Sequence, residues 1–507
     1  MSRNRPPRRE RRQAAPAPSA TKPFRHIRNP YAPMEVLRPD QLEQIHQASM
    51  RIVSEIGIDF FDDEALAVWQ AAGARVDHTS RHVWIDPDLL LEAVAQAPAE
   101  FGLQARDPAK SLRIGGNHIN FGTVAGAPFY SDMEVGRRPG LLADFERMVR
   151  LAHVCEPMHL IEGLLVEPQD VPVPHRHLEK VLRQYLYTDK AITVAAHGRM
   201  VANDCLAMAA ILYGRPAAEQ PEPVLMGNIN ANSPLRFDDR MLGAALTYAH
   251  HGQAVIITPF ILAGAMSPVT IAAAIAQQNA EALACIALLQ LASPGAPVVY
   301  GGFTTNVDMQ SGSPAFGTPE GAIALFAGAQ LARRYGLPYR GSGGLNTAKI
   351  PDAQASYETQ MSLWPAVMGH ANVIFHSAGW LEAGLVCSLE KFVVDMEGLA
   401  VMQHFLDGLT VNDETLALDS IAEVGPGGHH FGTPHTMARF RDAFYMPLVS
   451  DRQNYQNWQE QGGLDTAQRA HQVAQQLLKS YEQPALDTAV AEALHEFVAQ
   501  RKRELPG

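Results

Sequence analysis

The sequence predicts an α/β fold: a (β/α)8 TIM barrel with an N-terminal helical and hairpin extension and C-terminal helices. Eight short apolar runs recur along the chain, helical patterns lie between them, and no linker divides the 507 residues. Buried parallel strands read as continuous apolar runs. We expect barrel strands at Leu160–Val166, Ala191–Ala196, Pro223–Asn230, Ala254–Pro259, Pro297–Gly302, Pro338–Gly343, Asn372–His376 and Ser420–Gly425.

The stretches between these runs have the spacing of amphipathic helices. A doubly wound open sheet is the alternative arrangement, but the number of repeats is high for it. In addition, no GxGxxG turn follows the first run. The expected helices include His177–Leu186, Ala202–Tyr213, Arg236–His250, Gly321–Tyr335 and Gln354–Gly369.

The segment before the barrel predicts helices and one hairpin. Pro39–Ile56 has apolar residues at helical spacing, with Asp40 as the expected N-cap. Lys110–Thr123 predicts a hairpin with Gly115-Gly116-Asn117 at its turn. After the barrel, roughly the last 60 residues are helical and polar, and we expect them to pack across the barrel or to form a subunit contact. The two further short helices expected before the barrel are Asp63–Ala72 and Pro87–Ala97.

Composition and charge exclude several classes of protein. The chain is 47% hydrophobic and has a net charge of −12, whereas a nucleic-acid partner requires a basic surface. Residues 1–24 are rich in arginine but no apolar run follows, so we expect a disordered basic tail rather than a secretory signal. Weak contacts of that tail with anions are the alternative. Residues 25–507 are expected to form a single domain, with barrel strands over about 160–425.

Two further observations predict a cytoplasmic protein without membrane contact. The most apolar helix candidate, Ile271–Leu291, is interrupted by five polar residues, which predicts a buried helix rather than a membrane span. The four cysteines are scattered without any CxxC pair, which is typical of small buried side chains in a reducing compartment. No histidine cluster has the spacing of a zinc site, so we expect no metal, and a site assembled from distant strands is the open alternative.

Polar side chains follow several expected strands at the ends where barrels carry their active sites. Arg340 lies in a run that is otherwise apolar or glycine, and an unpaired buried guanidinium is costly. It either binds a substrate carboxylate or forms an internal ion pair with Asp308 or Asp352. His376 ends another run, and it is either a site residue or a satisfied core histidine. Asn228 and Asn230 end a third run.

Two other features suggest contacts with a ligand or a partner. Tyr130 lies in a loop before the barrel, where its ring either binds a cationic substrate or simply packs. Glycines cluster at four strand ends, which indicates either close approach of a large cofactor or partner, or ordinary turns.

The strand ends also carry three separated motifs in a specific order. They are Gly301-Gly302-Phe303 with Asp308-Met309 and Gly317-Thr318-Pro319-Glu320; Lys349-Ile350-Pro351-Asp352-Ala353-Gln354-Ala355 with Glu358; and Gly425-Pro426-Gly427-Gly428-His429 with His435-Thr436. With these motifs the sequence resembles the trimethylamine:corrinoid methyltransferase family over nearly the whole chain after the tail.

The resemblance implies transfer of a methyl group from an amine to the cobalt of a corrinoid carried by a separate small protein, with no tightly bound cofactor in this chain. The founding members use pyrrolysine, whose equivalent by motif register is near Lys349. This sequence has only standard residues. Members without pyrrolysine resemble demethylases of quaternary amines such as glycine betaine, so we expect a quaternary amine as the small-molecule substrate.

The resemblance also suggests roles for the strand-end residues. Arg340 and His376 are expected to hold a carboxylate and to be the catalytic pair, Tyr130 and Phe303 to contact the ammonium, and Asn228 and Asn230 to orient the pocket. The residues expected to face the corrinoid are Gly302, Gly341, Gly343, Gly427, Gly428 and His429. The alternatives are a trimethylamine-type enzyme, a metal-dependent barrel enzyme and a non-catalytic betaine-binding protein. We expect a homo-oligomer.

Overall fold

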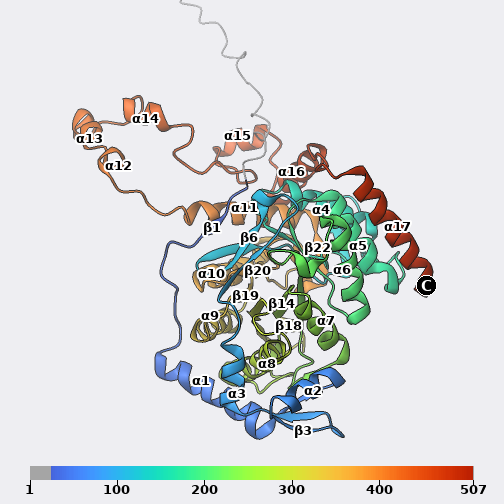
Figure 1. Ribbon diagram of the computed structural model, residues 1–507. Coiled ribbons are helices and arrows are strands. Elements are labelled where there is room, and N and C mark those ends of the chain that lie inside the picture. Colours follow the sequence, from blue (N-terminus) through green and yellow to red (C-terminus); the bar gives the residue numbers. More distant parts are fainter. Residues whose placement is uncertain (1–23, 506–507) are drawn as a thin grey trace, which may run out of the picture.

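A computed structural model describes residues 24–505, so the predicted tail over residues 1–24 lies almost wholly outside the described residues (Figure 1). Its centre is a curled, nine-stranded sheet. Eight of the strands are parallel and follow one another around the sheet in chain order. They are β7 (His118–Phe121), β10 (Leu160–Ile161), β11 (Ala191–Val194), β12 (Met226–Ile229), β14 (Ala254–Ile257), β16 (Val298–Gly301), β19 (Tyr339–Ser342) and β20 (Val373–Phe375).

The two ends of this run of strands meet at a single point. β20 pairs with β7 in parallel, and β7 is joined to β10 by one parallel bridge, between Gly122 and Leu160, in place of a full ladder. The short strand β1 (Ile27–Arg28) pairs antiparallel with the first half of β7. The expected α/β class and parallel sheet are therefore confirmed. Between β7 and β10 the sheet is joined by the single bridge alone.

A helix follows each parallel strand and covers the outside of the sheet (Figure 1). Local sequence explains where several of them begin: the side chains of Asp238, Thr318, Asp352 and Ser388 each accept a bond from a backbone N–H of the first turn. The eight helices are α4 (Leu142–Val154), α5 (Arg176–Tyr187), α6 (Arg199–Tyr213), α7 (Asp239–His250), α8 (Ile271–Ala292), α9 (Pro319–Arg334), α10 (Ala353–Met368) and α11 (Leu389–Phe405).

Helix α8 is the one described helix that is long and apolar enough to cross a membrane. Most of it, 83% of the most apolar window, is buried inside the protein. Its polar residues are buried too: Gln277 donates to the Glu281 carboxylate at 2.9 Å, and Asn279 contacts Tyr300 and Tyr335. The expectation of a buried helix at this position is confirmed.

The predicted eighth strand is wrong. Ser420–Gly425 lies in the exposed helix α13 (Leu418–Val424), and β7 takes the eighth place in the sheet. The predicted hairpin at Lys110–Thr123 is also wrong, because its two expected strands pair with other strands. The chain does turn at Gly115 and Gly116, but β6 (Leu112–Gly115) pairs with β5 (Glu100–Leu103), while β7 joins the parallel sheet. A turn signal shows where the chain reverses, and it does not decide which strands pair.

The extension before the sheet contains the expected helices. α1 (Pro39–Arg51) continues as a π-helix over Ile52–Ile56, and α2 (Asp63–Ala71) and α3 (Pro87–Val94) follow. Asp40 is not the N-cap of α1, because Pro39 already occupies the first helical position and Arg38 precedes it. A small sheet accompanies these helices, formed by β2 (Ile58–Phe60), β3 (Arg75–Asp77), β4 (His82–Trp84) and β13 (Arg236–Phe237).

Two small sheets continue the central strands past their carboxyl ends. One contains β15 (Phe260–Ala263), β17 (Phe303–Val307) and β18 (Pro314–Ala315), and the other contains β8 (Phe129–Asp132), β9 (Gly136–Pro139), β21 (Trp380–Leu381) and β22 (Val386–Ser388). Since β8, β15, β17 and β21 each come directly after a central strand, these sheets surround the end at which a barrel carries its active site.

The chain after α11 leaves the body and returns to it. The helices α12 (Asp413–Leu416), α13 and α14 (Pro434–Arg439) stand clear of the rest of the molecule (Figure 1). After α15 (Tyr455–Glu460), α16 (Thr466–Lys479) packs on α11 and α4, and α17 (Thr488–Glu504) packs on α6 and α5. The last helices therefore lie on the outer layer rather than across the sheet.

Candidate active site

The interior of the curled sheet is filled by apolar side chains at the amino ends of the strands. The hairpin of β5 and β6 covers this end and contributes to the same cluster. Because the amino end is closed, a ligand could reach the interior only from the carboxyl ends of the strands. The cluster includes Leu160, Ala191, Met226, Ala254, Val299, Val373 and Phe375 from the strands, and Phe101, Leu103, Leu112 and Ile114 from the hairpin.

Arg340 projects into this interior from β19. It pairs with Val373, a member of the interior cluster, and side chains of directly paired residues share a face. The residue is 2% exposed. Its guanidinium donates one hydrogen bond, from Nη1 to the Gly302 carbonyl at 3.3 Å, while Nε has no partner in the part of the chain that the structure describes. Burial lowers the pKa of Arg340 to about 10, which still leaves it cationic at neutral pH.

The internal ion pair considered for Arg340 is not formed. Asp308 accepts hydrogen bonds from its own loop at Ser311, and Asp352 caps α10. Within residues 24–505, no carboxylate oxygen lies within 4.0 Å of the Arg340 guanidinium. A buried guanidinium without an anion is unusual in a folded protein, so its position favours an anionic ligand.

Glu162 is a second buried ionisable group in the same interior, and the sequence analysis did not select it. A methyl group placed on Gly122 would lie 3.1 Å from Glu162 Oε1 and 3.3 Å from the Phe375 ring, so the carboxyl lies beside a member of the interior cluster. Oε2 accepts a hydrogen bond from Thr193 Oγ1 at 2.6 Å, and Oε1 has no hydrogen-bond partner among the described residues. Burial raises the pKa of Glu162 to about 8, against the opposing effects of Thr193 and Arg340.

Arg340 and Glu162 influence each other without touching. The positive charge of Arg340 lowers the pKa of Glu162, and the carboxyl raises that of Arg340. The two groups nevertheless lie beyond the 4.0 Å limit of an ion pair. Each leaves one buried polar atom unsatisfied. A guanidinium and a carboxyl that face one interior without forming an ion pair could hold a zwitterion between them, because the bound ammonium would favour the ionised form of the carboxyl.

Aromatic rings adjoin Arg340. The Arg340 guanidinium carbon lies 4.7 Å from the ring centre of Phe375 and 5.1 Å from that of Phe303. The His376 ring is centred 5.2 Å from Phe303 and 4.3 Å from Trp380. These rings form a wall able to contact a cation by its π faces. We refer to Phe303, His376 and Trp380 as the aromatic wall.

His376 is held in an unusual backbone conformation, with φ of 57°. A histidine at positive φ is uncommon, and such strain tends to occur at functional sites. Its Nδ1 lies 3.2 Å from Ser342 Oγ. Burial, and secondarily the charge of Arg340, lower the pKa of His376 well below its ordinary value, so the ring is neutral.

The two asparagines differ in position. Asn228 pairs with Ile256, a member of the interior cluster, and so faces the same interior, where its Oδ1 accepts a hydrogen bond from Thr258 at 2.9 Å. Asn230 comes after the end of β12 and is exposed. The structure thus brings Asn228, but not Asn230, to the same face as Arg340.

Tyr130 lies in the sheet of β8, β9, β21 and β22, and it is fully buried. Its hydroxyl donates to Asp132 at 2.9 Å and receives a bond from Arg147, and its ring lies beside Arg138. None of these contacts joins Tyr130 to Arg340 or His376. The guanidinium carbons of Arg138 and Arg147 lie 5.2 and 6.0 Å from the centre of the Tyr130 ring.

The six residues expected to face a corrinoid fall into two separate groups. Gly302, Gly341 and Gly343 are buried, and a methyl group on any of them would lie 2.5–3.0 Å from Tyr339, Leu325 or Ile374. These glycines permit close packing within the protein and form no cradle for a large group. Gly427, Gly428 and His429 are exposed on the segment that stands clear of the body.

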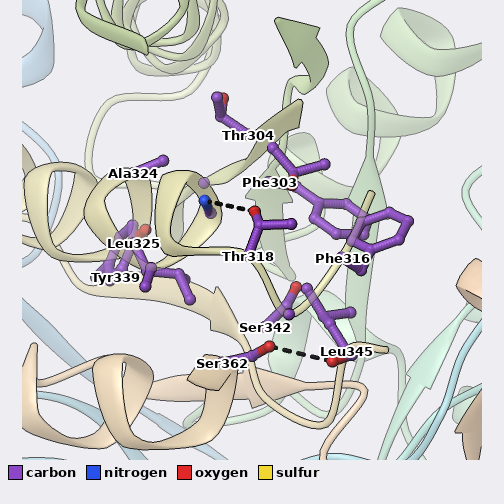
Figure 2. A pocket seen from close by; sticks show the side chains of 15 residues that line it. Phe303, Thr304, Phe316, Thr318, Ala324, Leu325, Tyr339, Ser342, Leu345 and Ser362 are labelled. Carbon is purple, nitrogen blue, oxygen red and sulfur yellow. Dashed lines mark hydrogen bonds between the residues drawn. The ribbon is translucent and has the colours of Figure 1, made fainter. Parts of the chain in front are cut away.

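A narrow cavity lies behind Phe303, between β17, β19 and α9 (Figure 2). Its volume is about 20 Å³, enough for a single water. Thr318 Oγ1 accepts a bond from Gly321 N at 3.1 Å, and Ser362 donates to the Leu345 carbonyl at 3.2 Å (Figure 2). The Tyr339 hydroxyl, which also lines the cavity, has no hydrogen-bond partner among the described residues. The cavity is nevertheless too small for a substrate.

Lys349 and the candidate metal ligands lie apart from Arg340 and His376 in their chemistry. Lys349 is exposed and donates to the Thr347 carbonyl at 2.7 Å. No group of three histidine, cysteine or acidic side chains within residues 24–505 could hold a metal ion. All four cysteines are free and buried.

Comparison with known proteins agrees with this arrangement. The model of the trimethylamine methyltransferase (MTTB) family matches residues 2–506. The glycine betaine methyltransferase of Desulfitobacterium hafniense (strain Y51) is 41% identical, over 93% of this chain and 98% of that protein. The trimethylamine methyltransferase MttB of D. hafniense (strain DSM 10664 / DCB-2) is 31% identical, over 92% of this chain and 93% of that protein.

One solved structure supports the fold. The monomethylamine methyltransferase (MtmB) of Methanosarcina barkeri superposes with a TM-score of 0.51 at 11% identity, covering 92% of this chain and 89% of that chain. The family suggested by the three sequence motifs is confirmed, and this chain belongs to the trimethylamine methyltransferase family.

Proposed function

We propose that this chain is a methyltransferase that removes a methyl group from glycine betaine or a closely related betaine and delivers it to a corrinoid protein. The observation that carries the proposal is the buried pair of Arg340 and Glu162, a cation and an ionisable carboxyl that face one interior and are not in contact. The relative named glycine betaine methyltransferase, at 41% identity, supports the same substrate class.

Arg340 would bind the carboxylate of the substrate. Its unpaired Nε and its singly bonded Nη1 leave donors for a carboxylate, and such charge-assisted bonds are about twice as strong as neutral ones. Neutral His376 would donate a further bond from Nε2, since its Nδ1 contacts Ser342. Trimethylamine has no carboxylate and would leave Arg340 unpaired, which disfavours it as the substrate.

The trimethylammonium group would lie between Glu162 and the aromatic wall. Phe303 and Trp380 offer ring faces to the cation, and Glu162 Oε1 offers an unpaired oxygen. Ammonium binding would favour the ionised form of Glu162 and so relieve the cost of its burial. Trp380 replaces the predicted Tyr130 in this role, and Asn228 would fix one side of the pocket.

A quaternary ammonium needs no chemical activation. When a nucleophile attacks the methyl carbon, the C–N bond breaks and its electron pair stays on nitrogen. The leaving group is therefore a neutral tertiary amine. The protein must bind the cation, aim one methyl group at the acceptor and exclude water, which is positioning work. A reduced corrinoid brought by a partner protein would supply the cobalt nucleophile. The strand-end glycines argue against a corrinoid bound within this chain, because side chains cover them.

We further propose that the curled sheet acts as a (β/α)8 barrel, with its open end toward the partner. The closed amino end and the two small sheets around the carboxyl ends support this orientation.

The test mixes the protein with a Co(I)-loaded corrinoid protein and a panel of trimethylamine, glycine betaine, proline betaine, carnitine and γ-butyrobetaine. The absorbance change from Co(I) to methyl-Co(III) should appear with a betaine. Calorimetric binding of the same panel to the protein alone separates recognition from turnover. Response to trimethylamine alone would refute the proposal, and tight betaine binding without transfer to a competent partner would favour the binding-protein alternative.

A further inference from the structure

A segment of the chain exposes apolar side chains that a folded monomer would normally cover. We call residues 409–444 the arm. It leaves the body at the end of α11, contains α12, α13 and α14, and stands clear of the body (Figure 1). Nine of the 27 exposed large apolar side chains of the described residues lie on the arm, so the exposure is concentrated there. They include Leu409, Leu418, Phe431, Phe440 and Phe444, which are 56–88% exposed.

The arm is an ordered element rather than a loose loop. Arg439 of α14 forms an ion pair with Glu414 of α12, and Ser420 of α13 contacts His430 at 3.4 Å. Asn412 and Thr433 cap α12 and α14. Among the described residues, the hydrogen bonds and ion pairs of its side chains stay within the arm. The arm therefore holds its own shape, while its large apolar side chains are not covered by the rest of the described chain.

The body carries an apolar groove beside the root of the arm. It lies along the outer face of α10, has a volume of about 920 Å³, and is lined by the exposed side chains of Met34, Tyr357, Met361 and Trp364. Phe405, the last residue of α11, packs against Trp364 with the ring centres 5.1 Å apart. The groove and the root of the arm are therefore continuous on one face of the molecule.

We propose that the arm binds in the groove of a second copy of this chain, and that the two copies exchange arms. A two-fold contact uses the same patch on both subunits, so that patch must supply both halves of the interaction. This face does so, because an arm and a groove that no other described residue covers lie side by side on it. The methionines of the groove are flexible enough to adapt to the inserted side chains.

The area also fits an obligate dimer. Phe431, Phe440 and Phe444 alone, at roughly 150–250 Å² each, give on the order of 500 Å² for one arm. Two arms and the two surfaces that they cover then bury about 2,000 Å² or more, which reaches the range of 2,000–5,000 Å² of obligate homodimers.

The test measures the mass of the purified protein by light scattering during size-exclusion chromatography. The expected mass is at least twice the 55.2 kDa of one chain. Phe431→Asp with Phe444→Asp on the arm, and separately Met361→Asp in the groove, should each give a folded protein of single-chain mass. Val173→Asp is the matched control, since Val173 is 70% exposed on another part of the surface, and it should leave the mass unchanged.

A cross-linking experiment distinguishes exchange from an arm that folds back on its own body. Because the four native cysteines are buried, a Phe431→Cys chain mixed with a Tyr357→Cys chain should form a disulfide between unlike chains. A wild-type mass of one chain would overturn the proposal, as would arm variants that keep the assembled mass. A single-chain protein whose arm is needed only to bind the corrinoid protein would assign the arm to that partner instead.

Discussion

Substitution of Arg340 by glutamine should weaken betaine binding and leave the free protein at least as stable. Among residues 24–505, Arg340 has one hydrogen bond and no carboxylate within 4.0 Å, so the substitution breaks no ion pair there. The substitution removes a buried charge, and with it the desolvation penalty that this charge imposes on the folded state. In the complex, by contrast, it leaves the carboxylate of the substrate buried and unpaired.

The expected change in Kd follows from the unpaired carboxylate in the complex, and the expected change in stability follows from the lost buried charge in the free protein. Truncating one partner of a buried, hydrogen-bonded charge pair costs about 2–5 kcal/mol of binding free energy. A central value of about 3 kcal/mol corresponds to a rise in Kd of roughly 150-fold. The same substitution should leave the free energy of unfolding unchanged or raise it by about 1–3 kcal/mol, since uncompensated burial of a polar group costs that amount.

Isothermal titration of glycine betaine gives the Kd, and chemical denaturation gives the stability. Arg199→Gln is the matched control, because Arg199 forms ion pairs with Asp62 and Glu64 away from the site. That variant should lose some stability and keep its Kd. An unchanged Kd in Arg340→Gln would refute the assignment of Arg340 to the carboxylate, and a large loss of stability would show that Arg340 is structural.

Two further predictions concern the other side of the pocket. Phe303→Leu should raise the Kd of glycine betaine by about 3- to 30-fold, the worth of a cation–π contact. It should hardly change the Kd of tert-butylacetate, which keeps the carboxylate but has a neutral carbon in place of the ammonium nitrogen; equal effects on both ligands would indicate lost packing only. Gly122→Ala should lower Tm and betaine affinity together, because the added methyl would lie 3.1 Å from Glu162 Oε1 and 3.3 Å from Phe375. Gly398→Ala is its control, since only the flexible end of Gln360 lies within 4 Å of the new methyl and the helix gains propensity.

The sequence predicted seven of the parallel strands because each is a continuous apolar run between helices. The eighth was misassigned because pairing in a parallel sheet is non-local. Nothing in the composition of β7 separates it from a hairpin strand next to the turn at Gly115. Ser420–Gly425 occupied the expected place in the repeat, although its apolar residues are exposed in a helix.

The positions of candidate site residues at strand ends were predictable from the sequence, whereas those of residues in the connecting segments were not. Arg340, Phe303 and His376 come together because strand-end positions converge at one end of the sheet. Tyr130 lies after β7, and the direction in which its segment folds is not encoded in a short motif. The glycines show a different limit, since sequence reveals a missing Cβ but not the neighbour that fills the space. Glu162 stands in an apolar run just as Arg340 does, and the same argument applied to it would have identified it.

Glu162 provides a pH-dependent test of the zwitterion site. Its pKa in the folded protein is about 8, above the ordinary value of 4.5, so the folded state holds a proton that the unfolded state releases. The wild-type protein should therefore lose stability relative to Glu162→Gln as pH rises from 4.5 to 8, by about 1.4 kcal/mol per pH unit and on the order of 5 kcal/mol at most. Above pH 8 the difference should be constant.

Bound betaine and the substitution of Arg340 should change this pH dependence of stability in opposite directions. A trimethylammonium beside Glu162 favours the carboxylate, so saturating glycine betaine should reduce the pH dependence, whereas Arg340→Gln should increase it by removing the opposing charge. Chemical denaturation at pH 5.5, 7 and 8.5, with and without betaine, measures both. A difference between wild type and Glu162→Gln that is independent of pH would refute the raised pKa. A pH dependence that betaine leaves unchanged would place the ammonium away from Glu162 and leave Arg340 as the only charged contact of the substrate.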